Sequence, residues 1–352
     1  MKIRVDKRKW HLAIVNAVLV LLVLTCLITF GILSRKLNSI DAAQRWRSGN
    51  EMRFAQISCF LPVDETKGDE DVFQFRRTLE QKLTEASLDP SGQTTLYSDA
   101  YSAEAKLSVK GENGSAEVKA IGVGGNFFLF HPLQLLSGSY LYETDLMQDR
   151  VILDESVAWQ LFGGSNVAGQ TVSIQGEPFY VAGVIRRESD FASKEAYGAG
   201  SGIFLSYSAL YKLTETGISC YEIVLPDMIS GFGLSLVKEN LSIGSGDLVQ
   251  NTGRFSVASL LRVIGNFGSR SMRNNGVIYP YWENAVRMIE DYLALLLVLM
   301  LVFALCPVVS GIVLLIRMIV RTYRIAASRI PEAAISVRER SREKRYAKRG
   351  EG

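Results

Sequence analysis

Residues 121–184 read IGVGGNFFLFHPLQLLSGSYLYETDLMQDRVILDESVAWQLFGGSNVAGQTVSIQGEPFYVAGV, and this stretch decides the fold. Within it, residues 151–163 (VILDESVAWQLFG) predict the entry into a helix that ends at a glycine. Residues 169–184 alternate apolar and polar side chains around a glycine, which predicts two short strands joined by a tight turn. Almost no filler separates these elements. Together with the two β-α-β patterns described below, they predict a mixed fold of the α+β class.

The order of these motifs resembles the periplasmic core domain of MacB-type and FtsX-like ABC transporter permeases. That family carries G-V-x-x-x-F-F, L-L-x-G, V-I-L-x-E-x-x-A-x-x-L-F-G and a glycine-bounded hairpin, which stand here at residues 122–128, 135–138, 151–163 and 169–184. The resemblance implies a ferredoxin-like porter lobe with an inserted lobe of strands and helices. It also implies structural roles for Gly122, Phe128, Gly138, Glu155, Ala158, Phe162, Gly163, Gly169, Gly176 and Gly183.

Two apolar runs hold a large share of the 48% of residues that are hydrophobic. Residues 12–33 and 293–316 contain no charged side chain, and at about 1.5 Å per residue each helix would reach about 33 to 36 Å. That length crosses a hydrocarbon core of about 30 Å. The first run is longer than a signal peptide's apolar region and lacks a small-x-small cleavage site, so we interpret it as an uncleaved anchor.

Basic residues flank both runs on the side away from residues 34–292. Lysine and arginine beside membrane helices gather on the cytoplasmic side. We therefore expect both termini in the cytoplasm, the region between the helices outside, and the protein in the cell membrane. The net charge of +3 follows from these flanks and gives no indication of nucleic-acid binding. The flanking residues are Lys2, Arg4, Lys7, Arg8 and Lys9, then Arg317, Arg321, Arg324 and Arg329.

The region between the helices shows two β-α-β patterns. The first uses residues 52–61 and a helical pattern at 72–86, and the second uses strands at 218–225 and 254–260 around a helix at 229–241. The predicted organisation is a cytoplasmic start (1–11), a transmembrane helix (12–33), a stalk (34–50), a porter-like lobe (51–123 and 215–260), an inserted lobe (124–214), a polar connector (261–292), a second transmembrane helix (293–316) and a basic cytoplasmic tail (317–352). We expect the stalk to be a polar helix that continues the first transmembrane helix and ends at Gly49. Within the connector we expect an interfacial belt of Tyr279, Tyr281, Trp282 and Tyr292.

The sequence contains few residues in patterns typical of catalytic or metal-binding sites. The two histidines, His11 and His131, form no metal-binding or nucleophile motif, and residues 164–171 have phosphate-loop spacing with Gln170 in place of the lysine. We therefore expect no enzyme activity, cofactor or metal. Spacing leaves a disulfide between Cys59 and Cys220 open. If their strands are parallel neighbours in a ferredoxin-like sheet, we expect the thiols to lie too far apart to bridge.

The apolar runs contain few residues suited to helix contacts. Asn16 either hydrogen-bonds another helix or sits at the membrane interface, and the interface interpretation is favoured. Pro307 predicts a kink, and Ser310 with Gly311 offers a small-residue face for close approach of a partner helix.

Full-length members of the MacB-type and FtsX-like family, which this sequence resembles, carry three transmembrane spans after the outer domain and a cytoplasmic coupling segment. Here no apolar run follows residue 316, and residues 336–343 (SVRERSRE) match S-V-x-E-R-x-R-E either as a motif or by coincidence. The resemblance implies a membrane subunit that works with another permease chain and a cytoplasmic ABC ATPase, with a homo-oligomer possible. The alternative is a membrane-anchored extracytoplasmic binding or scaffold protein without transport activity.

Overall fold

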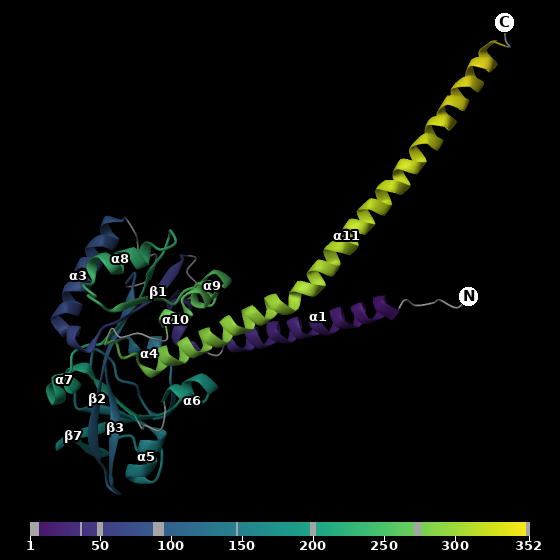
Figure 1. Cartoon of the computed structure of the whole chain (residues 1–352). Helices are drawn as coiled ribbons and strands as arrows, with labels where there is room; N and C mark the ends of the chain where they lie inside the picture. The colour runs from purple at the N-terminus through teal and green to yellow at the C-terminus, as the bar shows by residue number, and fades with distance from the viewer. Residues whose placement is uncertain are drawn as a thin grey trace. The chain divides into compact units, whose positions relative to one another are not determined.

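The computed structural model describes residues 7–35, 37–47, 52–86, 95–145, 147–197, 202–270 and 276–349 (Figure 1). The chain divides into two compact units, one of residues 31–294 and one that joins residues 1–30 to residues 295–352. We call the first the core unit and the second the helical unit.

The strands of the core unit are β1 (Phe54–Phe60), β2 (Ser98–Lys110), β3 (Ser115–Gly125), β4 (Gln134–Gly138), β5 (Arg150–Asp154), β6 (Thr171–Ile174), β7 (Glu177–Arg186), β8 (Gly202–Ser206), β9 (Cys220–Pro226) and β10 (Asp247–Gln250). Its helices are η1 (Asn38–Ile40), α2 (Ala42–Arg47), η2 (Val63–Glu65), α3 (Asp69–Glu85), α4 (Phe127–Phe130), α5 (Glu155–Phe162), α6 (Phe191–Tyr197), α7 (Tyr207–Thr214), α8 (Phe232–Asn240), α9 (Val257–Gly265) and α10 (Phe267–Arg270).

These strands form one continuous sheet in the order β10-β1-β9-β2-β3-β8-β5-β7-β4, with β6 paired to β2 and β7. The first four strands, with α3 after β1 and α8 after β9, have the ferredoxin-like β-α-β…β-α-β arrangement, and all their pairings are antiparallel. The strands between β3 and β9 in the sequence extend the same sheet beyond β3. The fold class is therefore the predicted α+β.

Helices cover both faces of this sheet. On one face, α3 buries Val72, Phe75, Leu79 and Leu83 at helical spacing, and α5, α7 and α8 complete the same hydrophobic cluster. On the other face, the second cluster brings together Ala42 of α2, Phe127 and Phe130 of α4, and Tyr281 with Trp282. Those last two residues begin the long helix α11 (Tyr281–Arg349), so the core unit includes the start of α11.

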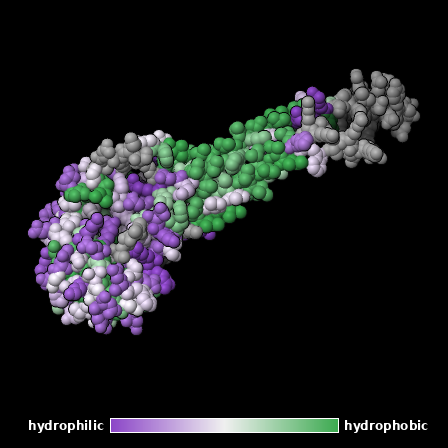
Figure 2. All heavy atoms as spheres, turned by 60° about the horizontal axis from the view of Figure 1, so that its bottom comes forward, coloured by the Kyte–Doolittle hydropathy of each residue, from purple (hydrophilic) through white to green (hydrophobic). Residues whose placement is uncertain are grey.

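The helical unit contains most of α1 (Lys7–Leu33) and of α11. Two stretches are long and apolar enough to cross a membrane, Trp10–Leu33 and Tyr281–Ile325. Figure 2 shows apolar residues gathered along these long helices, whereas the visible face of the core unit is mainly hydrophilic. Side chains of a soluble protein would not leave so much contiguous apolar surface in water, which agrees with two membrane helices.

Three sequence expectations were wrong in detail. Residues 254–260 are not a strand, because Ser256 caps α9 by accepting a hydrogen bond from the Ser259 amide at 3.3 Å. The expected connector is therefore largely helical. The aromatic belt is wrong for Tyr281 and Trp282, which are buried in the core unit. The stalk consists of η1 and α2 instead of an extension of α1, and Gly49, its expected end, lies outside the described residues.

Cys59 and Cys220 are free thiols, but the expected reason was wrong. Strands β1 and β9 are antiparallel, with Cys59 opposite Tyr221 and Phe60 opposite Cys220. Since successive residues of a strand point to opposite faces, Cys59 enters one hydrophobic cluster and Cys220 the other. The sheet itself separates the two sulfur atoms.

Candidate functional site

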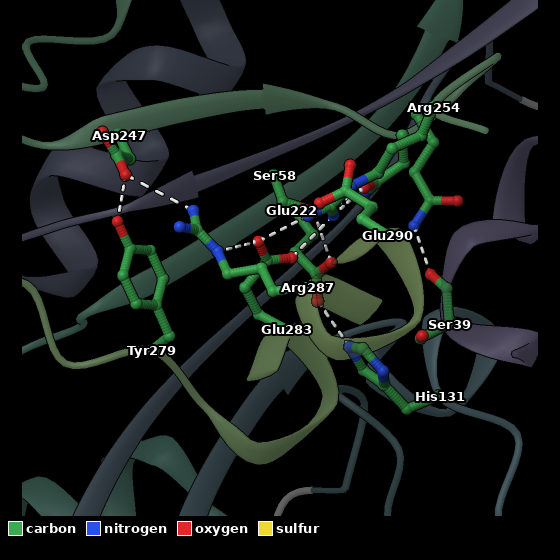
Figure 3. Close-up of polar contacts among 12 residues, drawn as sticks. Ser39, Ser58, His131, Glu222, Asp247, Arg254, Tyr279, Glu283, Arg287 and Glu290 are labelled. Atoms are coloured by element: carbon green, nitrogen blue, oxygen red, sulfur yellow. Dashed lines mark hydrogen bonds and ion pairs between the residues drawn. The ribbon is translucent and has the colours of Figure 1, made fainter. Parts of the chain in front are cut away.

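A network of buried and partly buried polar side chains fastens the first turns of α11 to the sheet (Figure 3). We call it the joint and define it as Ser39, Gln56, Ser58, His131, Glu222, Asp247, Asn251, Arg254, Tyr279, Glu283, Arg287 and Glu290. All of these residues belong to the core unit.

Arg254, in the loop between β10 and α9, is the centre of the joint. Its guanidinium donates to both carboxylate oxygens of Glu283 at 2.8 Å, and to those of Glu290 at 2.8 and 3.0 Å. A fifth hydrogen bond, of 2.9 Å, reaches Asn251 Oδ1. All five donor positions of the fork are thus used, and the side chains of Arg254, Glu283 and Glu290 are almost completely buried.

The local sequence explains why both glutamates reach one arginine. Glu283 and Glu290 are seven residues apart on α11, which places them on the same face of the helix two turns apart. Arg254 follows β10 closely, and β10 pairs with β1 at the edge of the sheet. The pairing of β10 therefore positions the arginine, and the helical period positions the acids.

A second arginine of α11 extends the joint toward β10. Arg287 donates to Glu283 Oε1 at 2.6 Å and approaches Asp247 Oδ2 at 3.4 Å. Its guanidinium stacks over the ring of Tyr279 at 3.7 Å, and the Tyr279 hydroxyl donates to Asp247. The start of α11 is thereby tied to the β10 strand as well as to the loop after it.

Another arm runs from the loop through the sheet to α4. Asn251 donates to Ser58 Oγ at 2.8 Å, Ser58 donates to Glu222 Oε1 at 2.6 Å, and the other oxygen of Glu222 contacts His131 Nε2. The imidazole of His131 packs against Trp282 with ring centres 4.4 Å apart. This arm therefore returns to the first turn of α11 by way of two neighbouring strands.

The last arm holds the segment that follows α1. Gln56 of β1 donates to the Ser39 carbonyl at 2.6 Å and accepts from the Ala42 amide at 2.9 Å. The Gln56 carbonyl in turn accepts from the Asn251 amide at 2.8 Å. The segments that lead to both long helices are therefore fixed on the same part of β1.

The charges of the joint constrain its geometry strongly. Burial would lower the pKa of Arg254, but the carboxylates of Glu283 and Glu290 outweigh burial and raise that pKa, so the guanidinium stays charged. Removing one partner of such a buried ion pair costs about 3 to 5 kcal/mol, because the other charge is left without compensation. Alternative positions of α11 against the sheet would break several of these bonds at once.

The joint offers no evident chemistry. Among the described residues no group of three or more histidine, cysteine, aspartate or glutamate side chains could hold a metal ion. The carboxylates of Glu283 and Glu290 are engaged by arginine, and both side chains are almost completely buried. What the arrangement can do is hold two elements in one relative orientation.

The family-motif residues lie outside the joint. A Cβ at Gly122 would come within 2.7 Å of the Leu210 side chain, so this glycine lets α7 pack closely on β3. Gly163 ends α5 in the left-handed conformation, with φ of 77°. The others are buried Ala158, half-buried Phe162, Glu155 beside Arg186, Phe128 stacked on Tyr140, Gly138 and Gly183 on paired strands, and Gly169 and Gly176 in turns.

The predicted helix-contact residues lie in the helical unit. Asn16 donates from Nδ2 to Ser310 Oγ at 3.1 Å, so α1 and α11 contact each other there. Pro307 lies inside α11, and Gly311 has no atom within 4 Å of a Cβ built on it. Whether these residues meet a partner chain stays a prediction.

The joint was not predicted from the sequence. Its one visible signal was the pair of acids at residues 283 and 290, seven apart and just before an apolar run, where acidic side chains need a partner. Arg254 and Asn251 gave no signal, because only the pairing of β10 with β1 brings them to α11.

These features define a membrane protein in which an extracytoplasmic α+β domain is built around the ends of two apolar helices. The sequence matches the family model of the MacB-like periplasmic core domain over residues 20–230, and the chain belongs to this family. Comparison with curated proteins finds no match.

Comparison with solved structures finds matches that include two outer domains of transporters. The periplasmic region of MacB from Actinobacillus actinomycetemcomitans is 19% identical with a TM-score of 0.42, and the match covers 60% of this chain and 92% of that one. The extracellular domain of the ABC-type transporter YknZ from Gram-positive bacteria is 14% identical with a TM-score of 0.37, covering 53% of this chain and 92% of that one.

Proposed function

We propose that this chain is a membrane subunit of the ABC transporter permease type, which relays conformational change between a cytoplasmic ATPase partner and its own extracytoplasmic domain. In this proposal both termini are cytoplasmic, as the basic flanks favour. The observation that carries the proposal is the continuity of α11, whose buried first turns belong to the joint and whose later turns are the apolar run.

A helix transmits movement to a domain well when one end of the helix is fixed firmly to that domain. Glu283, Arg287 and Glu290 fix the start of α11 through buried ion pairs, and a rotation of the helix by one residue would turn these side chains by about 100° away from Arg254. A tilt or shift of α11 would therefore move β10 and β1 with it. The Gln56 contacts would carry the same movement to the segment after α1.

We propose further that the chain neither catalyses a reaction nor transports alone. Two apolar helices cannot enclose a polar pathway, and residues 293–316 carry no charged side chain to line one. A second permease chain, or a second copy of this chain, would complete the membrane part. ATP hydrolysis would take place on the cytoplasmic partner.

Affinity purification of the tagged full chain from native membranes, followed by mass spectrometry, tests this function. We expect an ABC ATPase and a permease chain to be recovered together with it. Recovery of the intact chain with neither would contradict the relay and favour the alternative, a membrane-anchored binding or scaffold protein.

A further inference from the structure

An open cavity of about 860 Å³ lies beside the joint, at the edge of the core unit where β1 begins and β9 and β10 end. Its lining includes Arg53 before β1, Arg262 on α9, and Arg254 and Arg287 of the joint. Glu290 is the acidic residue of the lining, and both of its oxygens are occupied by Arg254.

Arg53 and Arg262 are the arginines of this lining that reach solvent. Arg262 is exposed on α9, and the Arg53 side chain is about half exposed although one nitrogen lies 3.3 Å from the buried carboxylate of Asp227. That carboxylate also accepts from the amides of Gly231 and Gly233, so its charge is spread over several donors. The wall of the cavity thus presents positive charge to an incoming group.

Exposed apolar side chains stand next to these arginines. Met228 and Ile229 are 60% and 77% exposed in the loop between β9 and α8, which supplies Ser230 to the cavity. Val257 and Leu261, one turn apart on α9, are 58% and 50% exposed. Ser259, Arg262 and Asn266 form the polar side of the same helix and line the cavity. Basic and apolar residues divided in this way are typical of segments that lie in a membrane interface.

The depth of the cavity in a bilayer follows from the covalent chain. Glu290 lines the cavity and precedes Leu293, where the apolar run begins, by three residues, or about 4.5 Å of helix. Lipid headgroups occupy about the outer 5 to 7 Å on each side of the hydrocarbon core. With the apolar run of α11 in a bilayer, the part of the cavity wall formed by Glu290 lies at the level of the headgroups.

We infer that this edge of the core unit rests on the bilayer surface and that the cavity binds the headgroup of an anionic phospholipid through Arg53 and Arg262. Met228, Ile229, Val257 and Leu261 enter the interface beside it. The inference depends on α11 spanning a membrane and is independent of the proposed relay.

The test places the full chain in nanodiscs of equal parts phosphatidylcholine and phosphatidylglycerol, with photoreactive benzoylphenylalanine in place of Leu261. We expect cross-links to lipid, enriched in phosphatidylglycerol. Arg262→Gln should lower that enrichment about fivefold, the effect of one arginine near an anionic surface. Arg77→Gln, which removes an exposed arginine on α3, is the matched control and should leave the enrichment unchanged.

Three results would overturn the inference. They are cross-links to protein without lipid, equal capture of the two lipids by the parent, and an enrichment that Arg262→Gln leaves unchanged. Benzoylphenylalanine in place of the exposed Phe73 on α3 reports background capture. Because Leu261 and Arg262 are both exposed, neither change disturbs the packed core.

Discussion

Arg254 and Glu283 share two hydrogen bonds of 2.8 Å across 29 residues of sequence, and both side chains are buried. Arg254 belongs to the loop after an edge strand, whereas Glu283 belongs to the first turn of the helix that becomes an apolar run. This pair therefore ties the first turn of α11 to the edge of the sheet within the core unit.

Loss of the arginine should destabilise the core unit. Arg254→Gln leaves two buried carboxylates without a full charge partner and should lower the free energy of unfolding by about 3 to 5 kcal/mol. Thermal unfolding of the full chain in detergent, followed by near-UV circular dichroism, measures the loss. Arg254→Met combined with Glu283→Leu and Glu290→Leu removes all three charges and should cost less than Arg254→Gln alone. If Arg254→Gln were as stable as the control Arg77→Gln, which changes an exposed arginine, the ion pairs of Arg254 would contribute little to stability.

Close packing at Gly122 gives a second prediction. In Gly122→Ala the added methyl meets the Leu210 side chain at 2.7 Å, and overpacking of this kind costs about 1 to 3 kcal/mol. Gly164→Ala is the matched control, since a Cβ there meets nothing within 4 Å. Equal unfolding midpoints for the two variants would be evidence against the tight α7–β3 contact.

The cysteines provide a third prediction. Burial raises the pKa of the Cys59 thiol to about 12, more than the nearby Lys67 lowers it, and burial likewise raises the pKa of Cys220. At neutral pH the thiolate is therefore scarce, and its fraction grows as the pH rises toward that pKa. We expect iodoacetamide to label Cys59 and Cys220 slowly in the native chain. After denaturation without a reductant both should be labelled. A requirement for reductant would reveal a disulfide.

Gly311 provides the fourth prediction, which concerns partners. A Cβ at this position meets nothing within 4 Å, so we expect Gly311→Leu to leave the Asn16–Ser310 contact between α1 and α11 intact. If a partner helix packs on this glycine, the added leucine should reduce co-purification of membrane partners severalfold. Val302→Leu, at an exposed site on the same helix, is the control. Unchanged recovery with Gly311→Leu would exclude this face as the contact.

Much of the fold was predictable because its signals are local. Each of three such signals lies within a short stretch of sequence. They are the alternation around Gly176, the glycine that ends α5, and the helical spacing of Val72, Phe75 and Leu79. Local pattern gave a wrong prediction at residues 254–260. There Phe255 and Val257 alternate as in a strand, while the cap at Ser256 begins a helix. The sequence pattern alone could not show that the helix cap outweighs the strand-like alternation.

The joint was not predictable because tertiary pairing creates it. Tyr281 and Trp282 have the composition and the position of an interfacial belt, and only their contacts with α4 and the sheet bury them. Likewise, the antiparallel register of β1 and β9 decides which face each cysteine takes. Apart from the acids at residues 283 and 290, the residues that fasten α11 can therefore be recognised in the structure but not in the sequence.

The relay is tested most directly by hydrogen exchange of the full chain, reconstituted with the ATPase recovered from its membranes, with and without ATP. If α11 carries movement through the joint, ATP should change amide exchange across residues 247–254 of the parent chain, which the proposed topology puts on the opposite side of the membrane from the ATPase. In Arg254→Gln the ATPase should still bind and hydrolyse ATP, but that change should be lost. An ATP response that is absent from the parent, or equally large in Arg254→Gln, would contradict the account.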